Sequence, residues 1–182
     1  NENMDAILET WFAGTMAGDA ISSILTGKTN PSGKLTISFP RNTGQIPVYY
    51  NSKNTGRPFD QNNKYTSKYL DTENTPLYPF GYGLSYSNFE YSTPTISKSQ
   101  MTVKDSVAIY LNVKNKGPYG GEEIVQLYIR DINASITRPL KELKNFEKIY
   151  LNSGESKVVK FILKGEDFSF LDRNLQKIVE PG

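Results

Sequence analysis

The sequence predicts a mainly β protein, in which a β-sandwich follows a short helix-strand unit and a long irregular connector. Two observations lead to this prediction. After residue 91, apolar residues recur with a period of two in several runs separated by glycine-rich turns, and no helical pattern lies between them. Before residue 41 the pattern is first helical and then alternating, and between these two parts the periodicity disappears.

The helix-strand unit comes first in the chain. Within residues 5–26 apolar side chains fall at helical spacing, which predicts two short helices, broken near Gly14 and ended by Gly27. The periodic residues are Ile7, Leu8, Trp11, Phe12, Ile21, Ile24 and Leu25. Residues 34–39 then alternate polar and apolar side chains as far as Pro40, which predicts a strand.

The connector, residues 41–86, is dominated by Asn, Ser, Thr, Gly and Pro. Half of the aromatic residues of the chain nevertheless lie in this stretch or just after it. A disordered linker has no need of so many large apolar rings. We therefore expect the connector to be ordered and to pack against a neighbouring element.

Residues 87–182 contain the period-two runs, which predict half-buried strands. Glycines at 117–121 and the NSGES turn at 152–156 separate consecutive runs. Between the inward-facing residues, Lys160 and Lys164 point outward. The expected core residues are Val107, Ile109, Leu111, Val125, Leu127, Ile129, Phe161 and Phe168.

The residue types that the chain lacks exclude several kinds of site. Without Cys it has no disulfides and no thiolate sites. Without His it lacks the usual general base near neutral pH, the orienting member of most Ser and Cys triads, and the commonest metal ligand. Hydrolase triads and zinc sites are therefore excluded, and we expect no cofactor.

The charge pattern argues against nucleic acid and membrane as partners. A formal charge of +2, with scattered lysines, gives little field for binding phosphates, and the Lys-rich stretch 141–160 is typical of a solvated sheet face. No apolar run is long enough to cross a bilayer, and the N-terminus lacks the basic-then-apolar order of a signal peptide. We expect any export signal to lie outside this chain.

Several short motifs of the first half follow one another in a specific order. They are AILETWFAG at 6–14, GDAI at 18–21, NPSGKL at 30–35, FPR at 39–41, GQIPVYYN at 44–51 and YPFGYGLSY at 78–86. This series resembles the C-terminal part of glycoside hydrolase family 3 β-glucosidases. Residues 1–40 look like the end of that family's α/β sandwich domain, and 41–86 look like its connector. Met16 departs from the family, which commonly carries Glu there.

The second half continues the resemblance. VKNKG at 113–117, EIVQLY at 123–128 and RPLKEL at 138–143 are similar to the fibronectin type III-like domain, an immunoglobulin-like sandwich, that ends many of these enzymes. The resemblance implies that residues 87–182 form this domain. Family members usually continue beyond the position of Gly182 into one more strand, so we expect the sandwich to lack its last strand here.

The resemblance also implies a function. The parent protein is expected to be a retaining, exo-acting glycosidase whose nucleophilic Asp lies in a barrel and whose acid/base Glu lies upstream of Asn1. This chain is then an inactive, structural segment, and its partners are the upstream barrel and α/β sandwich domains, with carbohydrate bound through the parent. The alternative is a stand-alone carbohydrate-binding module, or a dimerisation module that forms a homo-oligomer. A periplasmic or secreted bacterial location is favoured over the cytoplasm.

The carboxylates of the chain do not offer the pair that a retaining glycosidase needs, which lies about 5 to 5.5 Å apart. Glu122 and Glu123 are neighbours on a predicted strand and leave opposite faces, and the pair at 166–167 fails in the same way. Asp71 and Glu73 share a face at about 7 Å in an extended chain, but they lie in the turn-like LDTENTP. We therefore expect no catalytic residue here.

Three residues are candidates for contact with substrate. Arg57 and Phe59 lie in an irregular loop, where a guanidinium beside an aromatic ring can meet sugar hydroxyls; a salt bridge or packing of the connector is the alternative. Trp11, the sole Trp, either stacks on a sugar ring or faces the core. No loop has the oxygen-ligand spacing of a calcium site, so we expect no metal.

Overall fold

The computed structural model describes residues 4–182 and has the mainly β fold that the sequence predicts. The elements are α1 (Ala17–Leu25), the 3-10 helix η1 (Thr43–Gln45), β1 (Phe89–Tyr91), β2 (Thr95–Ile96), β3 (Ser106–Asn115), β4 (Gly121–Ile129), β5 (Glu142–Leu151), β6 (Ser156–Lys164), the 3-10 helix η2 (Gly165–Phe168), β7 (Phe170–Leu171) and β8 (Lys177–Ile178). None of the three described helices has the length and apolar character of a membrane span.

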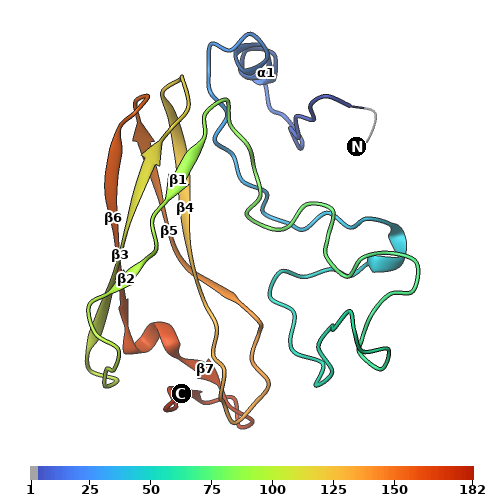
Figure 1. Cartoon of the computed structure of the whole chain (residues 1–182), viewed down its shortest axis with the longest axis vertical. Helices are drawn as coiled ribbons and strands as arrows, with labels where there is room; N and C mark the ends of the chain where they lie inside the picture. The colour runs from blue at the N-terminus through green and yellow to red at the C-terminus, as the bar shows by residue number, and fades with distance from the viewer. Residues whose placement is uncertain (1–3) are drawn as a thin grey trace.

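Two antiparallel sheets form the sandwich (Figure 1). In the first, β3 pairs with β6 along its whole length and also with β1 and β2. In the second, β4 pairs with β5, and the register shifts between Leu127 and Tyr128. The β7–β8 hairpin lies at the end of the sandwich opposite α1.

The core lies between the two sheets, and the predicted alternation is confirmed. Four predicted residues are buried: Val107, Ile109, Val125 and Phe161. The other four pack against this buried cluster: Leu111, Leu127, Ile129 and Phe168. Lys160 and Lys164 are exposed, as expected. Full burial of one such aliphatic or aromatic side chain contributes about 1.5 to 3 kcal/mol, so this cluster is the main source of stability.

Of the two predicted helices, only the second forms. Gly27 ends α1 as predicted, because its φ of +71° suits a residue without a Cβ and its N–H reaches the carbonyl of Ile24. The first helix was predicted wrongly: residues 4–13 contain no helix, and Trp11 has a φ of +50°. Helices this short are marginal unless packing covers their apolar face. Such packing is weak in this part of the chain, since even α1, which does form, contains no buried residue.

The predicted strand at 34–39 is also wrong, because only an isolated bridge between Phe39 and Tyr78 forms. Residues 35–39 instead run antiparallel to 77–82, and we call this pair of segments the stem. Leu35 donates to the carbonyl of Tyr82, and Gly81 donates to the carbonyl of Leu35. The stem remains irregular because Pro40 ends one side and a turn at 79–82 interrupts the other.

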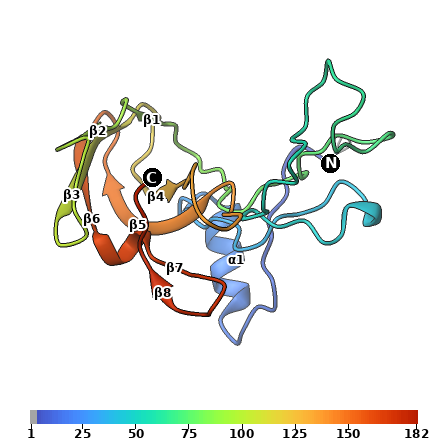
Figure 2. The ribbon, with the colours of Figure 1, turned by 90° about the horizontal axis from the view of Figure 1, so that it is seen from below.

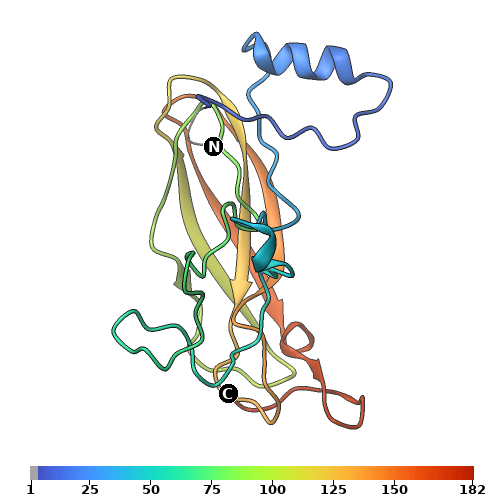
Figure 3. The same cartoon turned by 90° about the vertical axis from the view of Figure 1, so that its right-hand side faces the viewer.

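The connector lies against the outer face of β4, which confirms that it packs on a neighbour. Figure 2 shows it standing out from the sandwich on that side, and in Figure 3 it lies in front of the strands. Tyr50 stacks on Phe80 at 4.2 Å between ring centroids and meets Tyr128 of β4 edge-on at 6.2 Å. Gly81 sits so close to Gln126 that a Cβ would lie 2.2 Å from Oε1, and its φ of +81° also requires glycine.

Candidate functional site

Much of the connector forms a loop whose two ends are held together next to the stem. Gln45 is almost fully buried, and its Nε2 donates to the carbonyls of Glu73 and Thr75 at 2.8 and 3.3 Å. Arg41 reinforces this tie, because its guanidinium contacts Glu73 Oε2 at 2.6 Å and the Thr75 carbonyl at 3.0 Å. Residues 46–72, which we call the excursion, therefore begin and end at this tie.

The far end of this excursion carries Arg57 and Phe59, which the structure brings together. Both line a cavity of ≈ 400 Å³, together with Asp60 and Tyr65. The loop is held by its own polar contacts, such as Ser67 N–H to the Arg57 carbonyl at 3.1 Å. Within residues 4–182 the guanidinium of Arg57 makes no ion pair or hydrogen bond, so it is available to a ligand.

Trp11 is placed elsewhere. Its ring stacks on Phe39 of the stem, with 6.0 Å between centroids, and it does not line the cavity at Arg57. Just over half of its surface is exposed, so it is neither a core residue nor part of the same site as Arg57.

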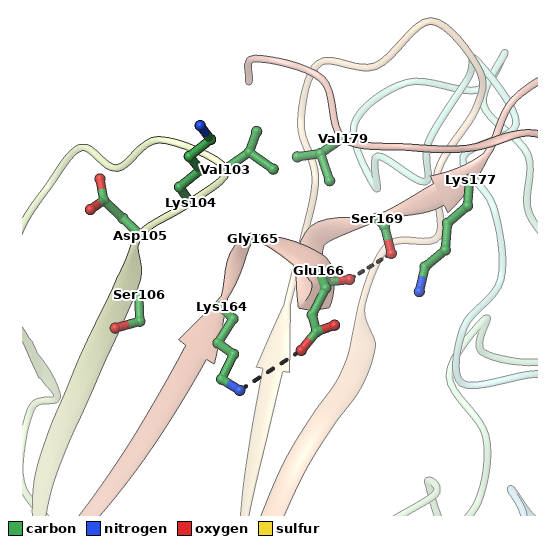
Figure 4. Close-up of a pocket in the computed structure, with 10 residues that line it drawn as sticks. All are labelled: Val103, Lys104, Asp105, Ser106, Lys164, Gly165, Glu166, Ser169, Lys177 and Val179. Atoms are coloured by element: carbon green, nitrogen blue, oxygen red, sulfur yellow. Dashed lines mark hydrogen bonds and ion pairs between the residues drawn. The ribbon is translucent and has the colours of Figure 1, made fainter.

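A second cavity, of ≈ 560 Å³, opens where β3 begins and β6 ends, next to β8 (Figure 4). Its carboxylate Glu166 lies 4.0 Å from Lys164, and Lys177 extends from the opposite side. Asp105 at its rim accepts hydrogen bonds from Thr102, and these hold the pKa of Asp105 below its usual range. A general acid needs a raised pKa, so this arrangement does not suit acid catalysis.

The one buried carboxylate of the described chain, Glu123, lies between the sheets and the N-terminal segment. Its Oε2 contacts Lys34 Nζ at 3.0 Å, and its Oε1 accepts a 2.7 Å hydrogen bond from the hydroxyl of Tyr91. Burial, followed by Glu123 itself, raises the pKa of Tyr91 well above its ordinary value. Among residues 4–182, no group of three carboxylates is close enough to hold a metal ion.

Sequence reasoning missed Lys34, Glu123, Gln45 and Arg41. A lysine before an alternating segment and a glutamate in a strand are commonly solvated, so type and spacing gave no signal that they meet. One indication was present in NPSGKL, where polar Asn30, Ser32 and Lys34 alternate and therefore share a face in extended chain.

Two family models match different parts of the chain. The family model of the Glycosyl hydrolase family 3 C-terminal domain matches residues 1–86, and that of the Fibronectin type III-like domain matches residues 123–182. The first match covers α1, the stem and the connector, and the second begins within β4.

Relatives match the whole chain. It is 50% identical over 184 residues to the periplasmic β-glucosidase of Salmonella typhimurium and 44% identical over 181 residues to a β-xylosidase of Formosa agariphila. The crystal structure of a β-glucosidase from Listeria innocua in complex with glucose is 49% identical and superposes with a TM-score of 0.94.

All of this chain is covered in these comparisons, but it spans only 24% of the two relatives and 25% of the crystallised protein. The matched region is their C-terminal part. The motif order, the two family matches and the superposition agree: the chain belongs to glycosyl hydrolase family 3 and corresponds to the C-terminal part of its relatives, with the family's C-terminal domain followed by a fibronectin type III-like domain.

Proposed function

We propose that this chain is a non-catalytic, structural segment of a retaining, exo-acting glycoside hydrolase of the β-glucosidase type. The observation that carries the proposal is the state of Glu123, the buried carboxylate of the described chain. The side chain is buried, and each of its two oxygens already has a partner, Lys34 on one and Tyr91 on the other, so the carboxylate is not presented to a substrate. A retaining glycosidase needs a second carboxylate about 5 to 5.5 Å from such a group, with one pKa raised.

The carboxylates with shifted pKa values do not supply that partner. The pKa of Glu122 is lowered by Lys148 and Ser32, and that of Glu180 is lowered by Ser135. A lowered pKa keeps a carboxyl ionised, whereas the acid that protonates a leaving group must hold its proton near neutral pH. The nucleophile and the acid/base are thus assigned to upstream barrel and α/β sandwich domains, the partners of this segment.

The proposed organisation has three parts. Residues 1–40 complete the α/β sandwich domain, 41–86 form the connector, and 87–182 form the fibronectin type III-like domain. The name of the Salmonella relative supports a periplasmic location. Carbohydrate is bound through the parent enzyme, and the connector contributes to it.

Arg57 and Phe59 are the residues proposed to contact the substrate, at the leaving group of the glycosidic bond. The unpaired guanidinium offers several N–H donors in a fixed plane, and the half-exposed ring of Phe59 offers an apolar face, a combination that suits a pyranose. Trp11 is a separate, weaker candidate, because its ring is already stacked on Phe39.

Two measurements test this function. The purified chain is expected to be silent on aryl β-glucosides and aryl β-xylosides, and turnover that persists after repurification and disappears on mutation of one of its carboxylates contradicts the assignment. In the parent enzyme, Arg57→Ala is expected to raise KM for a disaccharide about tenfold, since a hydrogen bond from a charged donor is lost. The control is Lys68→Ala, in the same excursion but outside the cavity.

A further inference from the structure

Three alternate residues of the NPSGKL segment are directed at β4 and its leading turn. Asn30 Nδ2 donates to the carbonyl of Gly120 at 3.0 Å, Ser32 Oγ donates to Glu122 Oε2 at 3.1 Å, and Lys34 Nζ reaches Glu123 Oε2 at 3.0 Å. These contacts join two segments about 90 positions apart in the chain. They fix the line along which the N-terminal segment meets the sandwich.

Lys34 differs from its two neighbours because its ion pair is buried. Its side chain is 15% exposed and that of Glu123 is 9% exposed, whereas the Lys148–Glu122 pair on the outer face of the same strand is 49% and 42% exposed. Tyr91 occupies the other oxygen of Glu123, so the carboxylate has no freedom to turn away from Lys34.

Lys34 also sits at the base of the stem. Its Nζ donates to the carbonyl of Gly83 at 2.8 Å, directly after the stem residues 77–82. The two sides are packed tightly here, because a Cβ on Gly83 would lie 2.2 Å from the carbonyl oxygen of Gly33. One ammonium group therefore joins the two sides of the stem at its base and attaches them to the interior of the sandwich.

We infer that Lys34 is a positioning residue whose ion pair with Glu123 sets the direction in which the connector leaves the sandwich, and with it the place of the Arg57 cavity relative to the sugar bound by the parent enzyme. The consequence for substrate rests on the proposed function of that cavity. The fixing of the stem does not depend on it.

The energetics of the Lys34–Glu123 pair favour a role in setting the direction of the connector over a role in stability. A buried ion pair contributes little net stability, because desolvation of the two charges offsets their attraction; its better-attested effect is to select one geometry. The connector also has other attachments, such as the hydrogen bond of 2.9 Å from Leu140 N–H to the Ser52 carbonyl. Loss of the pair therefore loosens the base of the stem and leaves the connector attached to the sandwich through Ser52.

The first arm of the test measures amide hydrogen exchange in this chain. Lys34→Met and Glu123→Gln are expected to speed exchange of the stem amides of Leu35 and Gly81 about tenfold, as for loss of a hydrogen bond to a charged group. Lys34→Arg, which keeps the charge, restores protection. Lys148→Met, which breaks the exposed pair, leaves the stem unchanged, and amides of β3 and β6 stay protected in every variant. Unchanged stem exchange in Glu123→Gln overturns the inference, even if Lys34→Met does not fold.

The second arm uses the parent enzyme. Lys34→Met and Glu123→Gln are expected to raise KM for a disaccharide several-fold at unchanged kcat, whereas Lys148→Met has no effect; a merely structural role lowers thermal stability without this split. If stem exchange rises but neither Lys34→Met nor Arg57→Ala moves KM, the cavity is not a subsite and the positioning of the stem stands. If Arg57→Ala raises KM while the Lys34 and Glu123 variants match wild type in both arms, the positioning is wrong.

Discussion

The hydroxyl of Tyr91 donates a 2.7 Å hydrogen bond to Oε1 of Glu123 and thereby joins β1 of one sheet to β4 of the other. Burial is the main reason that the pKa of Tyr91 is raised, and the nearby carboxylate adds to it, because an anionic phenolate beside Glu123 is unfavourable. At high pH the hydroxyl of Tyr91 is therefore protonated in the folded state and ionised in the unfolded state.

This contact predicts a loss of stability in alkali. Above about pH 10 an unfolded tyrosine gives up its proton while Tyr91 in the folded chain keeps it, so the folded state binds more protons and the free energy of unfolding falls as pH rises. Tyr91→Phe removes this component. We expect the stability of wild type relative to Tyr91→Phe, measured by urea unfolding, to decrease between pH 9 and 11; a constant difference contradicts the contact.

Two neighbouring valines on β6 test the register of the sandwich. Val159 is 1% exposed, whereas Val158 is 62% exposed on the opposite face. Val159→Ala is expected to lower the free energy of unfolding by about 2 kcal/mol, from two lost methyl groups and the cavity left behind. Val158→Ala should stay within about 0.5 kcal/mol of wild type. Equal losses at the two positions would show that the faces are assigned wrongly.

Asn115 tests how much stability depends on the hydrogen bonds of one buried polar side chain. Its Nδ2 donates to the carbonyls of Tyr119 and Leu151 at 2.8 and 3.1 Å, and its Oδ1 accepts from Gly117 N–H at 2.9 Å. Asn115→Asp replaces both donors by a buried charge that faces two carbonyl oxygens, so we expect a loss of about 3 kcal/mol or more at pH 7. Asn112→Asp, exposed on the same strand, is the control and should be nearly neutral.

The N-terminal segment predicts self-association of the isolated chain. Its large apolar side chains are exposed, namely Ile7, Trp11, Phe12, Leu25 and Ile37. Exposed apolar surface beyond a few hundred Å² drives association. Sedimentation equilibrium at micromolar concentration should therefore show a dimer or larger species, and Phe12→Glu should shift it toward monomer. Leu70→Glu, an equally exposed position in the connector, should not. A monomer at all concentrations argues against the homo-oligomer.

The sandwich was predictable because its signal is local. Alternation in the runs around Ile109, Val125 and Phe161 requires only that one face of each strand be buried, and the turn at Gly154 needs only a residue that accepts positive φ. The first helix and the strand at 34–39 failed for the opposite reason. Their apolar spacing is real, but a short segment becomes regular only where packing covers its apolar face, and Phe12 and Ile37 are exposed.

Sequence reasoning singles out two candidate residues, whose contact with substrate stays a prediction, and it does not show how the loop around them is held. Arg57 and Phe59 stand out by type within an irregular loop, and they share one cavity. The ties that hold this loop join residues far apart in the chain, such as Gln45 with Glu73 and Lys34 with Glu123. Apart from the alternation of Asn30, Ser32 and Lys34, nothing in these segments indicates such pairs, because the sequence does not mark the distant partner of a polar side chain.

The closed stem has an evolutionary consequence. Because the part of the excursion from 54 to 72 lies between the attachment of Ser52 to Leu140 and the tie made by Gln45 and Arg41, its length is uncoupled from the register of the sandwich. Closing a loop twice as long costs only about 0.6 kcal/mol more, so insertions and deletions here are thermodynamically cheap. A lineage can therefore lengthen or shorten this excursion without refolding the domain that supports it.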